Sequence, residues 1–360
     1  MLKENRLAGI DLCRGLAAFA VILVHSGDET WGIPISNRAI QFRHLFYFAV
    51  PFFLAAYFYF ATKKSQLNIS WAFWQKKLKR IVVPYLLWST FFIVSKSIIL
   101  LLTNDSNQIW QLIADPVAIV FLGGASYHLY FIPLLVAGTP WLCLVNYLTK
   151  SKKSIWWLIS GSIVSIFVYQ LLIFSKNSFD LGSYIAFPQL LNQLEPNTLV
   201  YQIVRIILVN IAWTIRCLPY FLLSVLINQK LPLHQFRWFS RKNTMFLMVL
   251  GFLFFNTVGK QFLPEALSEI AIAFSLLLLG ISISKHLKNN SLIINLGLCS
   301  YGIYLIHPLI KSATEIIIIK LLPTLNYGVS ITSILVYSIF TFLISWLCIS
   351  ITFAFKNSIS

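Results

Sequence analysis

Arg14 and His25 interrupt an otherwise apolar stretch near the start of the chain. They are eleven positions apart, roughly three helical turns, so both side chains project from one face of a helix, about 16 Å apart along its axis. Asp11 lies three positions before Arg14 on the same stripe, where the two side chains can pair. Arginine suits phosphate groups, and a neutral imidazole suits proton transfer near pH 7. The spacing is therefore suited to binding an anion at one end and moving a proton at the other.

The composition indicates what kind of protein must hold this pair. Of 360 residues, 58% are hydrophobic and only 11% are charged, and the mean hydropathy is +0.78. Soluble domains carry about 25% charged residues, so the chain lacks the polar surface that a water-soluble fold of this length needs. This excludes a cytosolic globular enzyme, a disordered protein and a nucleic-acid binder. It predicts an all-α integral membrane protein.

Apolar runs long enough to cross a bilayer define the elements. A membrane helix needs about 20 predominantly apolar residues. The sequence predicts ten such helices, over residues 7–26, 42–62, 81–103, 128–149, 155–174, 203–227, 244–259, 264–284, 293–320 and 330–355. The apolar stretch 109–122 is broken by Asp115 and Pro116 and is predicted to be interfacial or re-entrant. No linker separates a soluble domain, so residues 1–360 are expected to form one transmembrane domain.

The net charge of +17 is explained by membrane topology. Most of the 28 lysines and arginines lie before the first span, after the last, or in the segments 63–80, 150–153, 230–242 and 285–288. These segments share one side of the membrane if ten spans alternate, and the opposite loops hold most of the acidic residues. By the positive-inside rule, both termini are predicted to be cytoplasmic. Arg14 then lies near the inner interface and His25 near the outer one.

Two further histidines, His128 and His307, are predicted to lie in the same outer half as His25. Each is as consistent with an interhelical hydrogen bond as with a functional site. Three histidines could bind zinc, but no carboxylate or closely spaced ligand pair accompanies them, so we expect no metal. The plain structural alternative for Asp11 and Arg14 is anchoring at the membrane interface, and for His25 it is capping the helix end.

The densest basic cluster is Trp74–Arg80, which leads into Pro84 and Tyr85. For most of its charges the expected role is contact with anionic lipid head groups. Lys77 and Arg80 share a helix face, and basic side chains at that spacing also suit a polyanionic ligand. The residues alone leave both roles open.

Several segments, taken in chain order, form a pattern. They are Asp11-x-x-Arg14-Gly15 followed by His25, then Val50-Pro51-Phe52-Phe53, then Lys77-x-x-Arg80 before Pro84-Tyr85, and finally Ser300-Tyr301-Gly302-Ile303-Tyr304-Leu305-Ile306-His307-Pro308. In motif order and ten-span layout the chain resembles the membrane-bound acyltransferase-3 family over essentially its whole length. The resemblance implies an enzyme that O-acylates cell-envelope glycans, typically moving an acetyl group from cytoplasmic acetyl-CoA to a sugar hydroxyl.

The resemblance also implies roles for individual residues. Arg14 and His25 correspond to the family's Arg-x10-His pair, which is needed for activity. Lys77 and Arg80 occupy its basic motif, which normally has two arginines; Lys77 keeps the charge but loses the bidentate fork.

A second departure from the family pattern follows residues 50–53. The family usually has a Ser-Gly pair where this chain has Tyr57-Phe58. Bulky side chains there are expected to hinder close helix packing, and with it to change the shape of the donor or acceptor cavity.

These roles combine into a hypothesis about mechanism. Arg14, Lys77 and Arg80 would hold the coenzyme A phosphates at the cytoplasmic mouth, and the thioester would lie near His25. His25 would act as general base or as a transient acyl carrier, and the sequence leaves both open. His128, His307 or a nearby tyrosine would stabilise the oxyanion, and Asp11 would line the site.

We expect acetyl-CoA to act as a substrate, with a succinyl donor as the alternative, and no permanently bound cofactor. The other expected partners are the lipid bilayer and a glycan or lipid-linked sugar acceptor, such as an exopolysaccharide, and the expected location is a bacterial inner (plasma) membrane. The competing interpretation is a transporter or flippase for a lipid-linked glycan. Composition fits that class equally well, but the sequence has no obvious inverted repeat.

Overall fold

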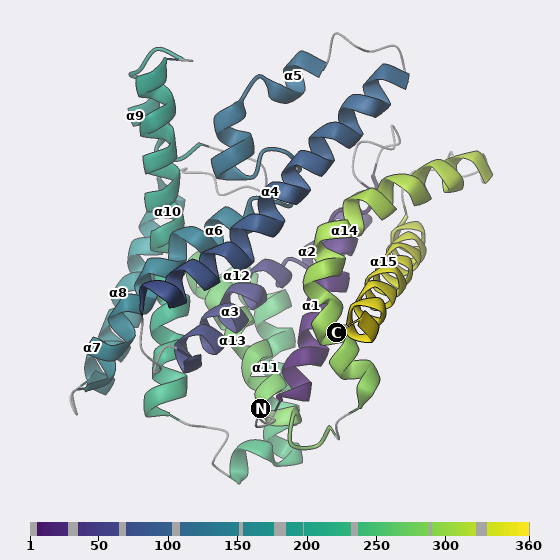
Figure 1. The fold of residues 1–360 in the computed structure, drawn as a ribbon. Coiled ribbons are helices and arrows are strands. Elements are labelled where there is room, and N and C mark those ends of the chain that lie inside the picture. The colour runs from purple at the N-terminus through teal and green to yellow at the C-terminus, as the bar shows by residue number, and fades with distance from the viewer. Residues whose placement is uncertain are drawn as a thin grey trace. The chain divides into compact units, whose positions relative to one another are not determined.

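The computed structural model describes residues 6–27, 35–64, 70–102, 109–150, 154–175, 185–196, 198–231, 237–287, 290–321 and 330–359 (Figure 1). Within this part of the chain, nine helices are long and apolar enough to cross a membrane. The first helix, α1 (Ala8–Val24), has 17 residues, at the lower end of the length that spans a bilayer. The prediction of an all-α, multi-span membrane protein is confirmed, and the orientation of its termini stays a prediction.

The chain divides into two compact units. The first comprises Met1–Ala56, Leu233–Leu263 and Ser268–Ser360, and the second Tyr57–Pro232 and Pro264–Leu267. The long helices of the first unit, besides α1 and the start of α3 (Ala49–Lys64), are α11 (Lys242–Phe254), most of α13 (Glu265–Ile283), α14 (Ser291–Leu321) and α15 (Ile331–Ile359). Those of the second unit are α4 (Trp71–Leu102), α8 (Ser154–Phe174) and α10 (Leu199–Val225). The expectation of a single transmembrane domain stays a prediction.

Helices α1, α14 and α15 pack together in the first unit (Figure 1). Ala18 and Ile22 of α1 form a buried core with Cys299 and Ile303 of α14. At Gly297, on α14, a Cβ atom would overlap the side chain of Asp11. A glycine is therefore required at this position, and it lets the two helices approach closely, as small residues do in membrane bundles.

The predicted span 42–62 is interrupted near its start. Helix α2 (Asn37–His44) ends, and α3 begins only at Ala49. Two carbonyls at this break accept hydrogen bonds from side chains of the segment that follows α11: Lys260 Nζ donates to His44 O over 2.7 Å, and Asn256 Nδ2 donates to Leu45 O over 2.6 Å. Irregular backbone at membrane depth needs such protein partners, so these two polar side chains stabilise the break.

In the second unit, α4 begins at Trp71, ten residues before the predicted start of its span. The basic cluster therefore lies within the same helix as the apolar span, which places Lys77 and Arg80 three positions apart on α4. Helix α10 packs against α8 and against α6 (Phe131–Gly138). The chain continues from α6 through η4 (Thr139–Leu144) into α7 (Val145–Lys150).

The stretch 109–122 is broken, as predicted, into α5 (Ile109–Ile113) and the π-turn η3 (Ala118–Leu122). Gly123 follows with φ of +87°, a conformation that favours glycine. The Tyr85 hydroxyl on α4 holds this turn, because it donates to Ile119 O over 2.6 Å and accepts from Gly123 N over 3.1 Å. The placement of the stretch at the membrane interface stays a prediction.

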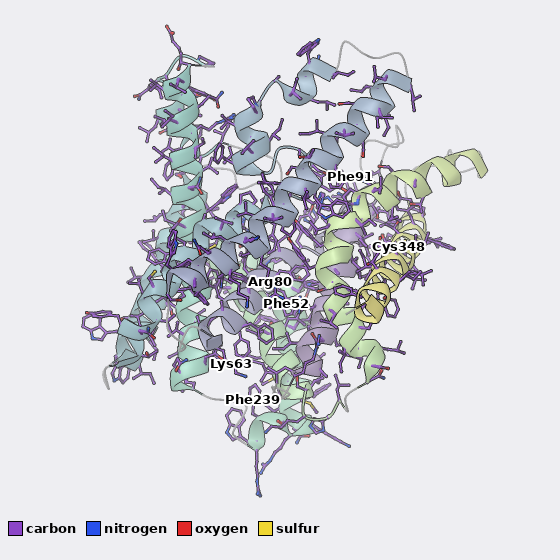
Figure 2. All side chains as sticks on the ribbon, in the orientation of Figure 1. Phe52, Lys63, Arg80, Phe91, Phe239 and Cys348 are labelled. Atoms are coloured by element: carbon purple, nitrogen blue, oxygen red, sulfur yellow. The ribbon has the colours of Figure 1, made fainter. Side chains whose placement is uncertain are left out.

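Large apolar side chains cover the outside of the long helices. They include Leu87 on α4, Phe167 on α8, Leu247 on α11 and Leu347 on α15, and Phe91, labelled in Figure 2, is 43% exposed. Exposed apolar surface of this extent is unusual for a soluble monomer. It is the surface that lipid chains cover.

Candidate active site

His25 and His307 lie together in the first unit. His25 caps the C-terminal end of α1, and His307 lies within α14. Their rings stack with centroids 6.1 Å apart and an angle of 23° between the planes. Because α1 and α14 run in the same direction, with Asp11 beside Gly297 at one end, the two histidines meet at the other end.

The orientation of the His307 ring is fixed by its own helix. His307 is fully buried, and its Nδ1 lies 2.7 Å from the backbone carbonyl oxygen of Tyr304. A carbonyl can only accept a hydrogen bond, so Nδ1 carries the hydrogen. In the neutral ring the lone pair is then on Nε2, which makes Nε2 the basic atom of this imidazole.

The sequence reasoning missed Lys311, a buried lysine four positions after His307. It is only 5% exposed and lies one helical turn beyond His307 on α14. Its backbone carbonyl accepts from the hydroxyls of Tyr337 (2.5 Å) and Thr314 (2.9 Å). A lysine four positions after a histidine in an apolar helix was a signal available in the sequence.

Arg14 pairs with Asp11, as predicted, although loosely. Arg14 Nη1 lies 3.8 Å from Asp11 Oδ1, and the Arg14 side chain is 30% exposed. Arg6 is the closer partner: its Nε donates to Asp11 Oδ2 over 2.6 Å. Asp11 thus links two arginines at the end of α1 opposite His25, and the sequence reasoning missed Arg6.

Lys77 and Arg80 differ in their surroundings within the second unit. Arg80 on α4, labelled in Figure 2, is exposed. Lys77 is half-buried, and its ammonium lies over the Tyr57 ring, 4.8 Å from the centroid, and 5.6 Å from the centroid of Phe73. Tyr57 is in turn hydrogen-bonded through its hydroxyl to Thr139 Oγ1 over 2.9 Å. Lys77 therefore has a defined position that the exposed Arg80 lacks.

Tyr57 and Phe58 do not open a gap between helices. Phe58 is fully buried and packs against Phe221 of α10. A Cβ atom at Gly138, on α6, would overlap both Phe58 and Cys217. The lack of a side chain at Gly138 thus makes room for the phenyl ring, and close packing is kept where the sequence suggested that it would be lost.

His128 belongs to the second unit. It is 1% exposed, its ring meets Phe92 of α4 edge to face with centroids 5.3 Å apart, and its Nδ1 lies 3.1 Å from Ser126 Oγ. Lys96 of α4 donates to the adjacent Ala125 carbonyl over 2.8 Å. His25 and His307 belong to the first unit, so the convergence of His128 with them stays a prediction.

An ion pair that the sequence reasoning missed joins Asp115 to Arg205 of α10. The guanidinium donates to both carboxylate oxygens, over 2.8 Å and 2.5 Å, and Arg205 is 6% exposed. Burial raises the pKa of Asp115, but hydrogen bonds from Arg205 and from the Ala118 amide, together with the Arg205 charge, outweigh it and lower the pKa overall. This ion pair links the turn before η3 to helix α10.

Among the residues that the structure describes, no group of three or more His, Cys, Asp or Glu side chains is placed to hold a metal ion. Proton transfer and anion binding are the chemistry that the site residues themselves offer.

Comparison with known proteins identifies a family. Residues 7–350 match a family described as an acyltransferase domain. No curated protein and no solved structure matches the chain. Because the match covers nearly all of a helical, multi-span chain, the protein belongs to the membrane-bound acyltransferase-3 family and is a membrane acyltransferase.

Proposed function

We propose that this acyltransferase moves an acetyl group from cytoplasmic acetyl-CoA to a sugar hydroxyl of a cell-envelope or exported polysaccharide. The observation that carries the proposal is the stacked His25–His307 pair at one end of two parallel helices, with Arg14 and Asp11 toward the other. One end offers imidazole nitrogens for proton transfer, and the other offers a guanidinium for phosphate.

In the proposed reaction, a neutral imidazole of the pair accepts the proton of the sugar hydroxyl. The hydroxyl oxygen forms a bond to the thioester carbonyl carbon, and the C–S bond then breaks. The coenzyme A sulfur leaves and takes up the proton, so the products are the O-acetyl sugar and free coenzyme A. In the alternative route, His25 first takes the acetyl group from sulfur and then passes it to the hydroxyl.

Donor binding is proposed for the basic side chains. Arg14 is 30% exposed and is held only loosely by Asp11, so its guanidinium can turn to a phosphate group. Lys77, over the Tyr57 ring, and the exposed Arg80 would supply the remaining positive charge. We propose a bacterial inner (plasma) membrane as the location, because the donor is cytoplasmic and the acceptor is an envelope glycan.

The experiment compares envelope glycans from cells with and without the gene by mass spectrometry. The proposal predicts acetylated sugars that disappear in the deletion strain and return with the wild-type gene. Succinylated sugars would show that the donor is succinyl-CoA. Unchanged acylation with an altered location of the glycan would contradict the proposal and indicate a transporter or flippase.

A further inference from the structure

Pro308 lies within α14, directly after His307. In a regular helix, the N–H of residue 308 would donate to the carbonyl of residue 304. Proline has no N–H, so it leaves that carbonyl without its helical donor. In this helix the carbonyl belongs to Tyr304, and it accepts from His307 Nδ1 over 2.7 Å.

This arrangement determines which nitrogen of His307 is basic. The Tyr304 carbonyl requires a hydrogen on Nδ1, which places the lone pair of the neutral ring on Nε2. In that tautomer Nε2 can accept a proton but cannot donate a hydrogen bond to an oxyanion. The geometry therefore favours proton acceptance by His307 over the oxyanion-stabilising role expected from the sequence.

The surroundings keep the ring in this orientation. His307 is 0% exposed, and its ring stacks on His25 on one side and lies 6.2 Å from the Tyr304 ring centroid on the other. An alanine at position 308 would restore an N–H that shares the Tyr304 carbonyl oxygen with Nδ1, because a carbonyl oxygen can accept two hydrogen bonds. The hydrogen bond from Nδ1 would then weaken, and the other tautomer would become more populated.

We propose that Pro308 is a positioning residue, which reserves the Tyr304 carbonyl for His307 Nδ1, and that His307 Nε2 is the atom that accepts the proton of the acceptor hydroxyl. This rests on the proposed acyl transfer. The O–H bond of the sugar breaks as the N–H bond forms at Nε2. After the C–S bond breaks, the same proton passes to the coenzyme A sulfur.

The first test measures the tautomer directly. His307 is observed by nitrogen NMR in 15N-histidine-labelled protein in lipid, and the His307→Asn spectrum identifies its signals. A protonated Nδ1 and an unprotonated Nε2 are expected in the wild type, and a mixture of tautomers in Pro308→Ala. Pro219→Ala, which changes a proline within α10, is the matched control and should leave the His307 signals unchanged. A protonated Nε2 in the wild type would overturn the inference, whether or not the protein transfers acetyl groups.

The second test measures transfer from labelled acetyl-CoA. His307→Asn keeps an N–H near the position of Nδ1 but lacks Nε2, so kcat should fall about 100-fold or more, as expected for loss of a general base. Pro308→Ala should lower kcat about tenfold while the KM for acetyl-CoA stays unchanged, because the base is misoriented but still present. Wild-type kcat in His307→Asn, or in a Pro308→Ala protein with mixed tautomers, would overturn the inference. An absence of transfer by the wild type would instead refute the proposed function.

Discussion

Replacing Tyr57 by leucine should weaken donor binding through Lys77. The Lys77 ammonium lies 4.8 Å from the centroid of the Tyr57 ring. A cation–π contact contributes about 0.5–1 kcal/mol at an exposed site and about 2 kcal/mol when desolvated. Lys77 is half-buried, so we take about 1 kcal/mol, which corresponds to a rise of about fivefold in the KM for acetyl-CoA. The kcat should stay close to wild type because the contact does not involve the reacting atoms.

The assay is initial-rate transfer in membranes with varied acetyl-CoA, at equal amounts of inserted protein. Tyr57→Phe is the matched control. It keeps the ring under Lys77 and loses only the hydrogen bond to Thr139, so its KM should stay within about twofold of wild type.

A double-mutant cycle tests whether Tyr57 acts through Lys77. In a Lys77→Met background the ring has no ammonium to hold, so Tyr57→Leu should cause no further rise in KM. An equal rise in KM with and without Lys77 would refute the reasoning, as would an unchanged KM in the single variant Tyr57→Leu.

Three further predictions concern other contacts. Arg14→Ala should raise the KM for acetyl-CoA with little change in kcat, and an unchanged KM in the same transfer assay would remove its role in phosphate binding. Asp115→Asn should lower the melting temperature in detergent at neutral pH, because it leaves the buried Arg205 guanidinium without its carboxylate. In the folded protein the pKa of Asp115 is below its ordinary value of 3.8. The ion pair therefore stabilises the fold fully above roughly pH 5, and this stabilisation is lost as the pH falls through the lowered pKa. A difference in melting temperature between the wild type and Asp115→Asn that persists well below that pKa would contradict this account. Gly138→Val should destabilise the protein by about 1–3 kcal/mol through overlap with Phe58 and Cys217, and Phe58→Ala in the same chain should recover part of the loss of melting temperature.

The helices and the local pairs were predictable from the sequence. Apolar runs predicted the membrane helices because the bilayer sets their length. The pair of Asp11 and Arg14 followed from helical spacing alone. Asp115 and Pro116 predicted the break in the stretch 109–122, because they interrupt an apolar helix.

The contacts between distant segments were not predictable. Nothing near His44 in the sequence indicates that Lys260 and Asn256 satisfy the carbonyls at the end of α2. Likewise, the space for Phe58 depends on Gly138, which lies 80 positions further along the chain. Such contacts depend on how helices pack, and helical periodicity specifies a face but not its neighbour.

Two local features could have been recognised and were missed. Pro308 lies four residues after Tyr304, so the loss of the helical donor to that carbonyl is readable from the sequence. The early start of α4 is also local, because lysine, arginine and glutamine are good helix formers. The span was predicted to start at residue 81 because the charges end the apolar part, whereas the helix itself continues through them.

The most direct test of the central claim is transfer of labelled acetyl groups from acetyl-CoA to glycan in membranes that carry His25→Ala. The matched control is His286→Ala, which changes an exposed histidine that contacts the Ser240 carbonyl. We predict wild-type transfer in the control and, in His25→Ala, a loss of about 100-fold or more at equal amounts of inserted protein, because the substitution removes the imidazole that stacks on His307. Full transfer by a normally inserted His25→Ala protein would contradict the assignment of the His25–His307 pair as the site of the reaction.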